Sequence, residues 1–158
     1  MTEKHAKEDI VEQERINLNK GKRPVLRDLY ARPGVGQKKT RGNLECHLNG
    51  FRYNSVKGDL IDVPFSNVKY AFFQPCEKEI IAAIHFRLVE PIMVGKKKTE
   101  DIQFYSEGGV VAEDVVGRGR GEDSDDEERQ KEIKRRIDRD FLAWTKSCEE
   151  FTNKVFEF

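Results

Sequence analysis

The chain has 158 residues, a size typical of one domain that can bury a core without disulfide bonds or a structural metal. Its 29 basic and 29 acidic side chains give a net charge of zero, which excludes nucleic-acid binding through overall positive charge. Three cysteines with no close pairing, no apolar run of about 18 residues and no signal-peptide core together predict a soluble intracellular protein with reduced thiols.

Residues 1–22 are highly charged and rich in helix-forming residues, so we expect a helical extension there. Strand signals begin at Val25, and from Leu44 to Leu48 apolar and polar residues alternate as in a half-buried strand. The following Asn49-Gly50 pair predicts a hairpin with a type I′ turn. Further strands are expected over residues 51–55, 60–65, 68–73, 80–88, 91–94 and 102–105.

This succession of short strands and tight turns over residues 23–107 predicts an antiparallel sandwich or small barrel. Residues 108–123 show no clear period and are expected to form a loop. A long helix is expected over residues 124–158, where Ser124 to Glu127 fits a capping box. Its apolar residues recur every three or four positions and form one stripe: Ile133, Ile137, Phe141, Trp144, Cys148, Phe151 and Val155.

The helix is long for a small barrel, since the span from Glu127 to Val155 measures about 43 Å at 1.5 Å per residue. We therefore expect its second half to extend past the barrel and to pack against a neighbouring module. The residues expected to make that contact are Trp144, Phe151, Val155 and Phe158.

Several phrases of the sequence, in one order, resemble a known family. They lie at residues 29–33 (LYARP), 49–53 (NGFRY), 65–69 (FSNVK), 73–76 (FQPC), 91–97 (PIMVGKK) and 101–105 (DIQFY). The match runs from about Leu26 to the end of the chain and resembles the first pleckstrin-homology-like (PH-like) module in the middle domain of the large subunit of FACT, a nuclear histone chaperone. The resemblance implies a mainly β (α+β) fold, a seven-stranded antiparallel barrel capped by a long C-terminal helix, with a second PH-like module following it.

The resemblance also implies a function without catalysis or cofactors. FACT-like large subunits bind histones, as tetramer or dimer, and reorganise nucleosomes during transcription, replication and DNA repair, so nuclear, chromatin-bound localisation is expected. The smaller FACT subunit would be bound through regions outside this chain. The family's aminopeptidase-like domain lies upstream and its acidic tail downstream, so the chain looks like a piece of a longer protein.

Two charged clusters are candidate contacts. The acidic run is a candidate histone contact and could also stabilise the start of the helix: Glu122, Asp123, Asp125, Asp126, Glu127 and Glu128. The basic residues between and after the last strands are candidates for a weak contact with DNA or another acidic partner: Lys96, Lys97, Lys98, Arg118 and Arg120.

Two other functions remain open. PH-like folds can bind phosphoinositide headgroups through basic residues between the first two strands, and the candidates here are Lys38, Lys39 and Arg41, with Lys57 or Lys69. The chain could also be a purely structural half of a tandem scaffold. Residues 34–40 lack the glycine spacing of a nucleotide-binding loop. His5, His47 and His85 have no zinc-ligand spacing, and we expect structural histidines and no catalytic site.

Overall fold

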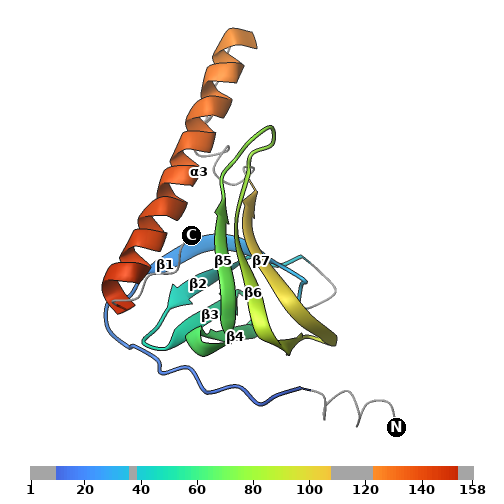
Figure 1. Ribbon diagram of the computed structural model, residues 1–158. Helices are drawn as coiled ribbons and strands as arrows, with labels where there is room; N and C mark the ends of the chain where they lie inside the picture. The colour runs from blue at the N-terminus through green and yellow to red at the C-terminus, as the bar shows by residue number, and fades with distance from the viewer. Residues whose placement is uncertain (1–9, 36–38, 108–122, 153–158) are drawn as a thin grey trace.

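The computed structural model describes residues 10–35, 39–107 and 123–152 and shows seven antiparallel strands followed by a long helix (Figure 1). The predicted seven-stranded PH-like barrel with a C-terminal helix is confirmed. No helix in these ranges is long and apolar enough to cross a membrane. The elements are β1 (Val25–Arg32), β2 (Gly42–Cys46), β3 (Gly50–Ser55), β4 (Leu60–Pro64), η1 (Phe65–Asn67, a 3-10 helix), β5 (Val68–Gln74), β6 (Ile81–Val94), β7 (Lys97–Glu107) and α3 (Asp123–Thr152).

The strands lie in the order β4-β3-β2-β1-β7-β6-β5, and β1 belongs to both halves of the barrel. Its first half, from Val25 to Leu29, pairs with β2, whereas Tyr30 to Arg32 pair with β7. The register shifts in the first half, where Asp28 has a positive φ of 60°. Such a bulge bends the strand, and the bend lets β1 close the barrel.

The strands predicted over residues 80–88 and 91–94 are one continuous strand, β6, whose register with β7 shifts between Arg87 and Ile92. Here the Glu90 N–H donates to Asn67 Oδ1 at 2.8 Å, and Asn67 Nδ2 donates to the Glu90 carbonyl at 3.0 Å. The side chain of Asn67 thus satisfies backbone groups beside Pro91, which is tolerated at such an irregularity.

The predicted type I′ turn at Asn49-Gly50 is wrong, because neither residue has a positive φ. Gly50 is already the first residue of β3 and pairs with Pro64 of β4. A Cβ atom at Gly50 would lie 2.3 Å from Ile16 Cδ1 and 2.8 Å from the Val63 carbonyl oxygen. The glycine is needed here for close approach. Positive φ occurs instead at Gly58 in the expected turn after β3.

Residues 10–22 of the N-terminal segment form neither helix nor strand. The helix predicted over residues 1–22 is absent from residues 10–22, and residues 1–9 lie outside the described ranges. The segment is held by its backbone, because Asn17 N–H donates to Asn49 Oδ1 at 2.6 Å and Asn49 Nδ2 donates to the Arg15 carbonyl at 2.8 Å. Its few apolar residues cannot form a helical stripe, and among residues 10–22 only Ile16 is buried.

Helix α3 closes the barrel with the predicted apolar stripe. Its buried residues are Ile133, Ile137, Phe141, Trp144 and Cys148. Trp144 is 4% exposed, and its ring centroid lies 5.6 Å from that of Phe51. Lys134 Nζ donates to the Glu77 carbonyl at 2.7 Å, which ties the β5–β6 loop to the helix.

The expected overhang of the second half of α3 is therefore wrong. Trp144 is buried in this domain, and Phe151 is partly buried against the same core. Val155 and Phe158 lie outside the described residues. The end of α3 that extends past the strands is its beginning, as Figure 1 shows. Sequence gives the length of a helix but not which of its turns meet the barrel.

Candidate functional site

The acidic helix start comprises Asp123 to Glu128, the first turns of α3. These turns project beyond the strands (Figure 1), and among residues 127–152, whose burial is described, the first buried residue is Ile133. The side chains of Glu127 and Glu128 are exposed. Glu122 lies outside the described residues. The helix begins at Asp123, one residue before the predicted cap Ser124. Carboxylates at the start of a helix are favoured by the positive end of its dipole, and those of Glu127 and Glu128 are open to a partner.

The basic groove is a depression of about 560 Å³ lined by residues of β1, β5, β6 and β7. Lys97 and Lys98 line it and are exposed, as is Lys96, which follows Gly95 in the β6–β7 turn. Arg118 and Arg120 lie outside the described residues. Sequence reasoning missed three further residues of this groove: Arg32, Phe72 and Arg87.

Charges within the basic groove are only partly balanced. Arg87 forms ion pairs with Glu100, at 3.0 Å, and with Asp101. The guanidinium of Arg32 lies 4.7 Å from the ring centroid of Tyr105, and in the described part of the chain it forms no ion pair. Burial, and then the charge of Arg32, lowers the pKa of His85 on the same groove wall, so His85 is neutral at physiological pH. The groove carries net positive charge.

Two aromatic rings stand beside this groove. Tyr70 and Phe72 point outward from β5, are 53% and 51% exposed, and stack with centroids 6.1 Å apart. Phe72 also lines the groove, so the surface joins positive charge to an aromatic face. The signal in the sequence was the alternation of β5, where the buried Ala71 lies between them.

The residues considered for lipid binding are not gathered into one basic patch. Lys38 lies outside the described ranges. Lys39 forms an ion pair with Glu107, and its Nζ lies 4.4 Å from the ring centroid of Tyr30; the bond to Glu107 raises the Lys39 pKa. Lys57 follows Val56, whose N–H donates to the Arg41 carbonyl at 3.0 Å, so Arg41 and Lys57 are neighbours. Lys69 lies apart on β5, with its Nζ 5.6 Å from the Tyr70 ring centroid.

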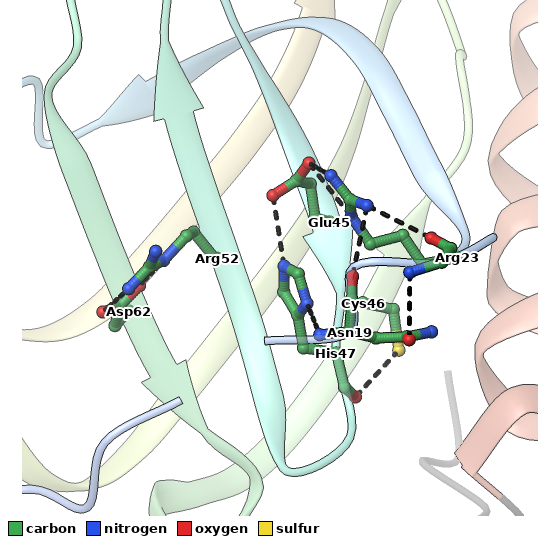
Figure 2. A network of polar contacts seen from close by, with 8 residues as sticks. Asn19, Arg23, Glu45, Cys46, His47, Arg52 and Asp62 are labelled. Carbon is green, nitrogen blue, oxygen red and sulfur yellow. Dashed lines mark hydrogen bonds and ion pairs between the residues drawn. The ribbon is translucent and has the colours of Figure 1, made fainter. Parts of the chain in front are cut away.

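His47 is buried and belongs to a partly buried network that holds the N-terminal segment, shown in Figure 2. Its Nδ1 accepts from the Asn19 N–H at 3.0 Å, so its Nε2 donates to Glu45, 3.1 Å away. Arg23 Nη2 donates to the same carboxylate at 2.7 Å. Burial opposes ionisation of Glu45, but the bonds from Arg23 and His47 outweigh it and lower its pKa. This arrangement fixes structure, as expected for His47.

The described ranges offer no metal ligand cluster of three or more His, Cys, Asp or Glu. All three cysteines are free, as predicted, and Cys46 and Cys148 are buried. Burial, and then the neighbouring Asp138, raises the pKa of the Cys76 thiol to about 12, which makes it a poor nucleophile.

Comparison with known proteins agrees with this picture. Residues 24–155 match the family model of the FACT complex subunit SPT16 PH-like domain. The chain is 42% identical over 160 residues to FACT complex subunit spt-16 of Caenorhabditis elegans, covering 99% of this chain and 16% of that protein. It is 39% identical over 163 residues to FACT complex subunit SPT16 of Zea mays, with 98% and 15% covered. It is also 47% identical over 120 residues to the Aspergillus fumigatus subunit, with 75% and 12% covered.

Proposed function

Because the chain belongs to the family of PH-like domains of the FACT complex subunit SPT16, we propose that it is a non-catalytic histone-binding module of a FACT-like complex. Such a complex would act in the nucleus, on chromatin, and reorganise nucleosomes during transcription, replication and DNA repair. The chain spans 16% of the worm relative, so the activity of the whole protein includes parts that lie outside it.

The observation that best supports histone contact is the acidic helix start. Histones are strongly basic, and clustered carboxylates attract a basic surface over several ångströms and speed the encounter. Since the first turns of α3 extend past the strands and Glu127 and Glu128 are exposed, a partner can approach these two residues without disturbing the barrel. The module would act by competition, covering histone surfaces that otherwise hold DNA or one another.

The basic groove supports a second, weaker contact with DNA. Lys97 and Lys98 are exposed and can reach phosphate oxygens, and Phe72 offers an aromatic face nearby. In the same proposal, the second PH-like module is a partner, with Val155 and Phe158 as candidate contacts. The smaller FACT subunit would bind elsewhere in the full-length protein.

The test is a pull-down of recombinant histone dimer and histone tetramer with the 158-residue chain over a series of salt concentrations. We expect retention at moderate salt, and loss when the acidic residues from Glu122 to Glu128 are replaced by their amides. Replacing Lys97 and Lys98 with Gln is the matched control for charge change: it should leave histone binding intact and weaken only DNA binding in a mobility-shift assay.

Two outcomes would contradict the proposal. Histone binding that appears only when the second module is added would identify this domain as a structural half of a tandem scaffold. Pelleting with phosphoinositide vesicles, without histone binding, would favour a lipid-binding module and would be expected to depend on Arg41 and Lys57.

A further inference from the structure

A second groove, distinct from the basic groove, lies between β1 and α3 and has a volume of about 410 Å³. Its walls are Val25 to Asp28 on the strand and residues 137–147 on the helix. The floor is apolar, since Leu26, Phe141 and Trp144 line it and are buried. Neither candidate charged cluster contributes to it. We call it the strand–helix groove.

One wall of this groove is a strand edge that has no strand partner among the described residues. β1 pairs with β7 only from Tyr30 to Arg32, so its first half has a strand neighbour on one side, β2. The Pro24 carbonyl accepts from Cys46 N–H at 3.0 Å and therefore points toward β2. Since backbone groups alternate in direction along a strand, those of Val25 point away from β2, toward the groove. No strand in the described residues pairs with this edge. Such an edge can accept an added strand.

Charge indicates what kind of segment would fit. Asp28 lies on the strand wall and Asp140 on the helix wall, both exposed, and neither carboxylate has an ion-pair partner among the residues that the structure describes. Arg27 also lines the groove, so two negative charges stand against one positive charge. A lysine or arginine carried by an incoming segment could lie between the two carboxylates, while an apolar neighbour covers Phe141 and Trp144.

We propose that the strand–helix groove binds an extended basic peptide segment, which adds a strand to the free edge of β1 and places a cationic side chain between Asp28 and Asp140. Main-chain hydrogen bonds to β1 would give affinity, and the carboxylates with the apolar floor would select alternating apolar and basic residues. The idea that histones supply this segment rests on the proposed function. The peptide site itself is argued from the groove alone.

The first experiment needs no histone. The isotope-labelled chain is titrated with a synthetic peptide of alternating valine and lysine, followed by NMR, with a valine–glutamate peptide as control. We expect shifts of amides in Val25–Asp28 and around Ala143 and Ser147, saturating with the lysine peptide alone. Shifts confined to other regions would overturn the proposal. Equal shifts on raising the protein concentration alone would assign the groove to a second copy of the chain.

Two variants act on the groove by different means. Asp28→Asn with Asp140→Asn removes both charges, and Asn tolerates the positive φ of Asp28. We expect about a five- to tenfold weaker peptide affinity, the range of two partly exposed ionic contacts. Ala143→Trp fills the groove from an exposed helix position and should abolish binding. Thermal unfolding checks the fold of both. Unchanged affinity for the valine–lysine peptide in either folded variant refutes the proposed binding site.

The matched control is Glu127→Gln with Glu128→Gln, which removes the same charge from the acidic helix start. The valine–lysine peptide should bind this control like the unchanged chain. If the control alone loses histone binding, the result supports the proposed function. It also shows that histones do not bind the strand–helix groove. If the groove variants lose peptide binding and neither the variants nor the unchanged chain binds histones, the peptide site in the groove is supported and the proposed function is refuted.

Discussion

Replacing Trp144 with Ala is the most direct test of how α3 closes the barrel. Trp144 is 4% exposed, and its ring lies 5.6 Å from Phe51. Phe51 in turn packs on Phe65 and Phe86, each with centroids 4.9 Å away. Removing the indole would therefore leave a cavity between the helix and the aromatic centre of the core.

The magnitude follows from this burial. Truncation of a buried tryptophan to alanine typically destabilises a protein by about 3–5 kcal/mol. With a urea slope of about 2 kcal/mol per molar, the unfolding midpoint should fall by about 1.5–2.5 M. Because Trp144 is the only tryptophan, unfolding must be followed by far-ultraviolet circular dichroism rather than by tryptophan fluorescence.

The matched control is Leu142→Ala, two positions away on the same helix but 49% exposed. It should destabilise the domain by less than about 1 kcal/mol. If both substitutions lower the midpoint equally, the second half of α3 does not pack on the barrel as described. Trp144 would then be available for a neighbouring module, as the sequence had suggested.

Three further outcomes are expected. Gly50→Ala should destabilise the domain by about 1–3 kcal/mol, because the new methyl group would lie 2.8 Å from the Val63 carbonyl oxygen, and limited proteolysis should then cut the N-terminal segment faster. Gly58→Ala meets open space and should cost only about 1 kcal/mol of strain at its φ of 90°, so equal effects in urea unfolding would contradict the close approach. The lowered pKa of Glu45 means that its stabilisation is present above pH 4.5, its unfolded value, and is lost as the pH falls toward the folded value. The urea midpoint should therefore fall less in Glu45→Gln than in the unchanged chain between about pH 6 and pH 3.5, and parallel curves would argue against the network of Figure 2.

The fold could be predicted because the spacing of apolar residues in each segment agrees with the strand or helix that the segment forms. The alternation from Leu44 onward set the strand faces, and the three-and-four spacing after Ile133 set the buried face of α3. Both periods follow from backbone geometry alone. The wrong predictions concern residues that make contacts with residues far away in the sequence. Asn49 and Gly50 resemble a turn, but Asn49 bonds the backbone of residues 15 and 17, and Gly50 makes room for Ile16.

The surfaces were predictable only where their residues are adjacent in sequence. The acidic helix start and Lys96 to Lys98 could be found as charge clusters. The partners of those lysines could not, because Arg32, Phe72 and Arg87 come from three different strands and meet only through the strand order. The strand–helix groove has the same origin: Asp28 and Asp140 are brought together by the docking of α3 on β1.

There is a physical reason why the beginning of α3, and not its end, extends past the strands. A helix is nucleated at a cost and extended more easily, so turns docked through Ile133 to Cys148 can support further turns N-terminal to Ile133. The supported end is the positive end of the helix dipole, and the chain places carboxylates there. The same carboxylates are therefore suited to stabilise these turns and would attract a basic partner, and removing them should weaken both the helix start and the proposed contact.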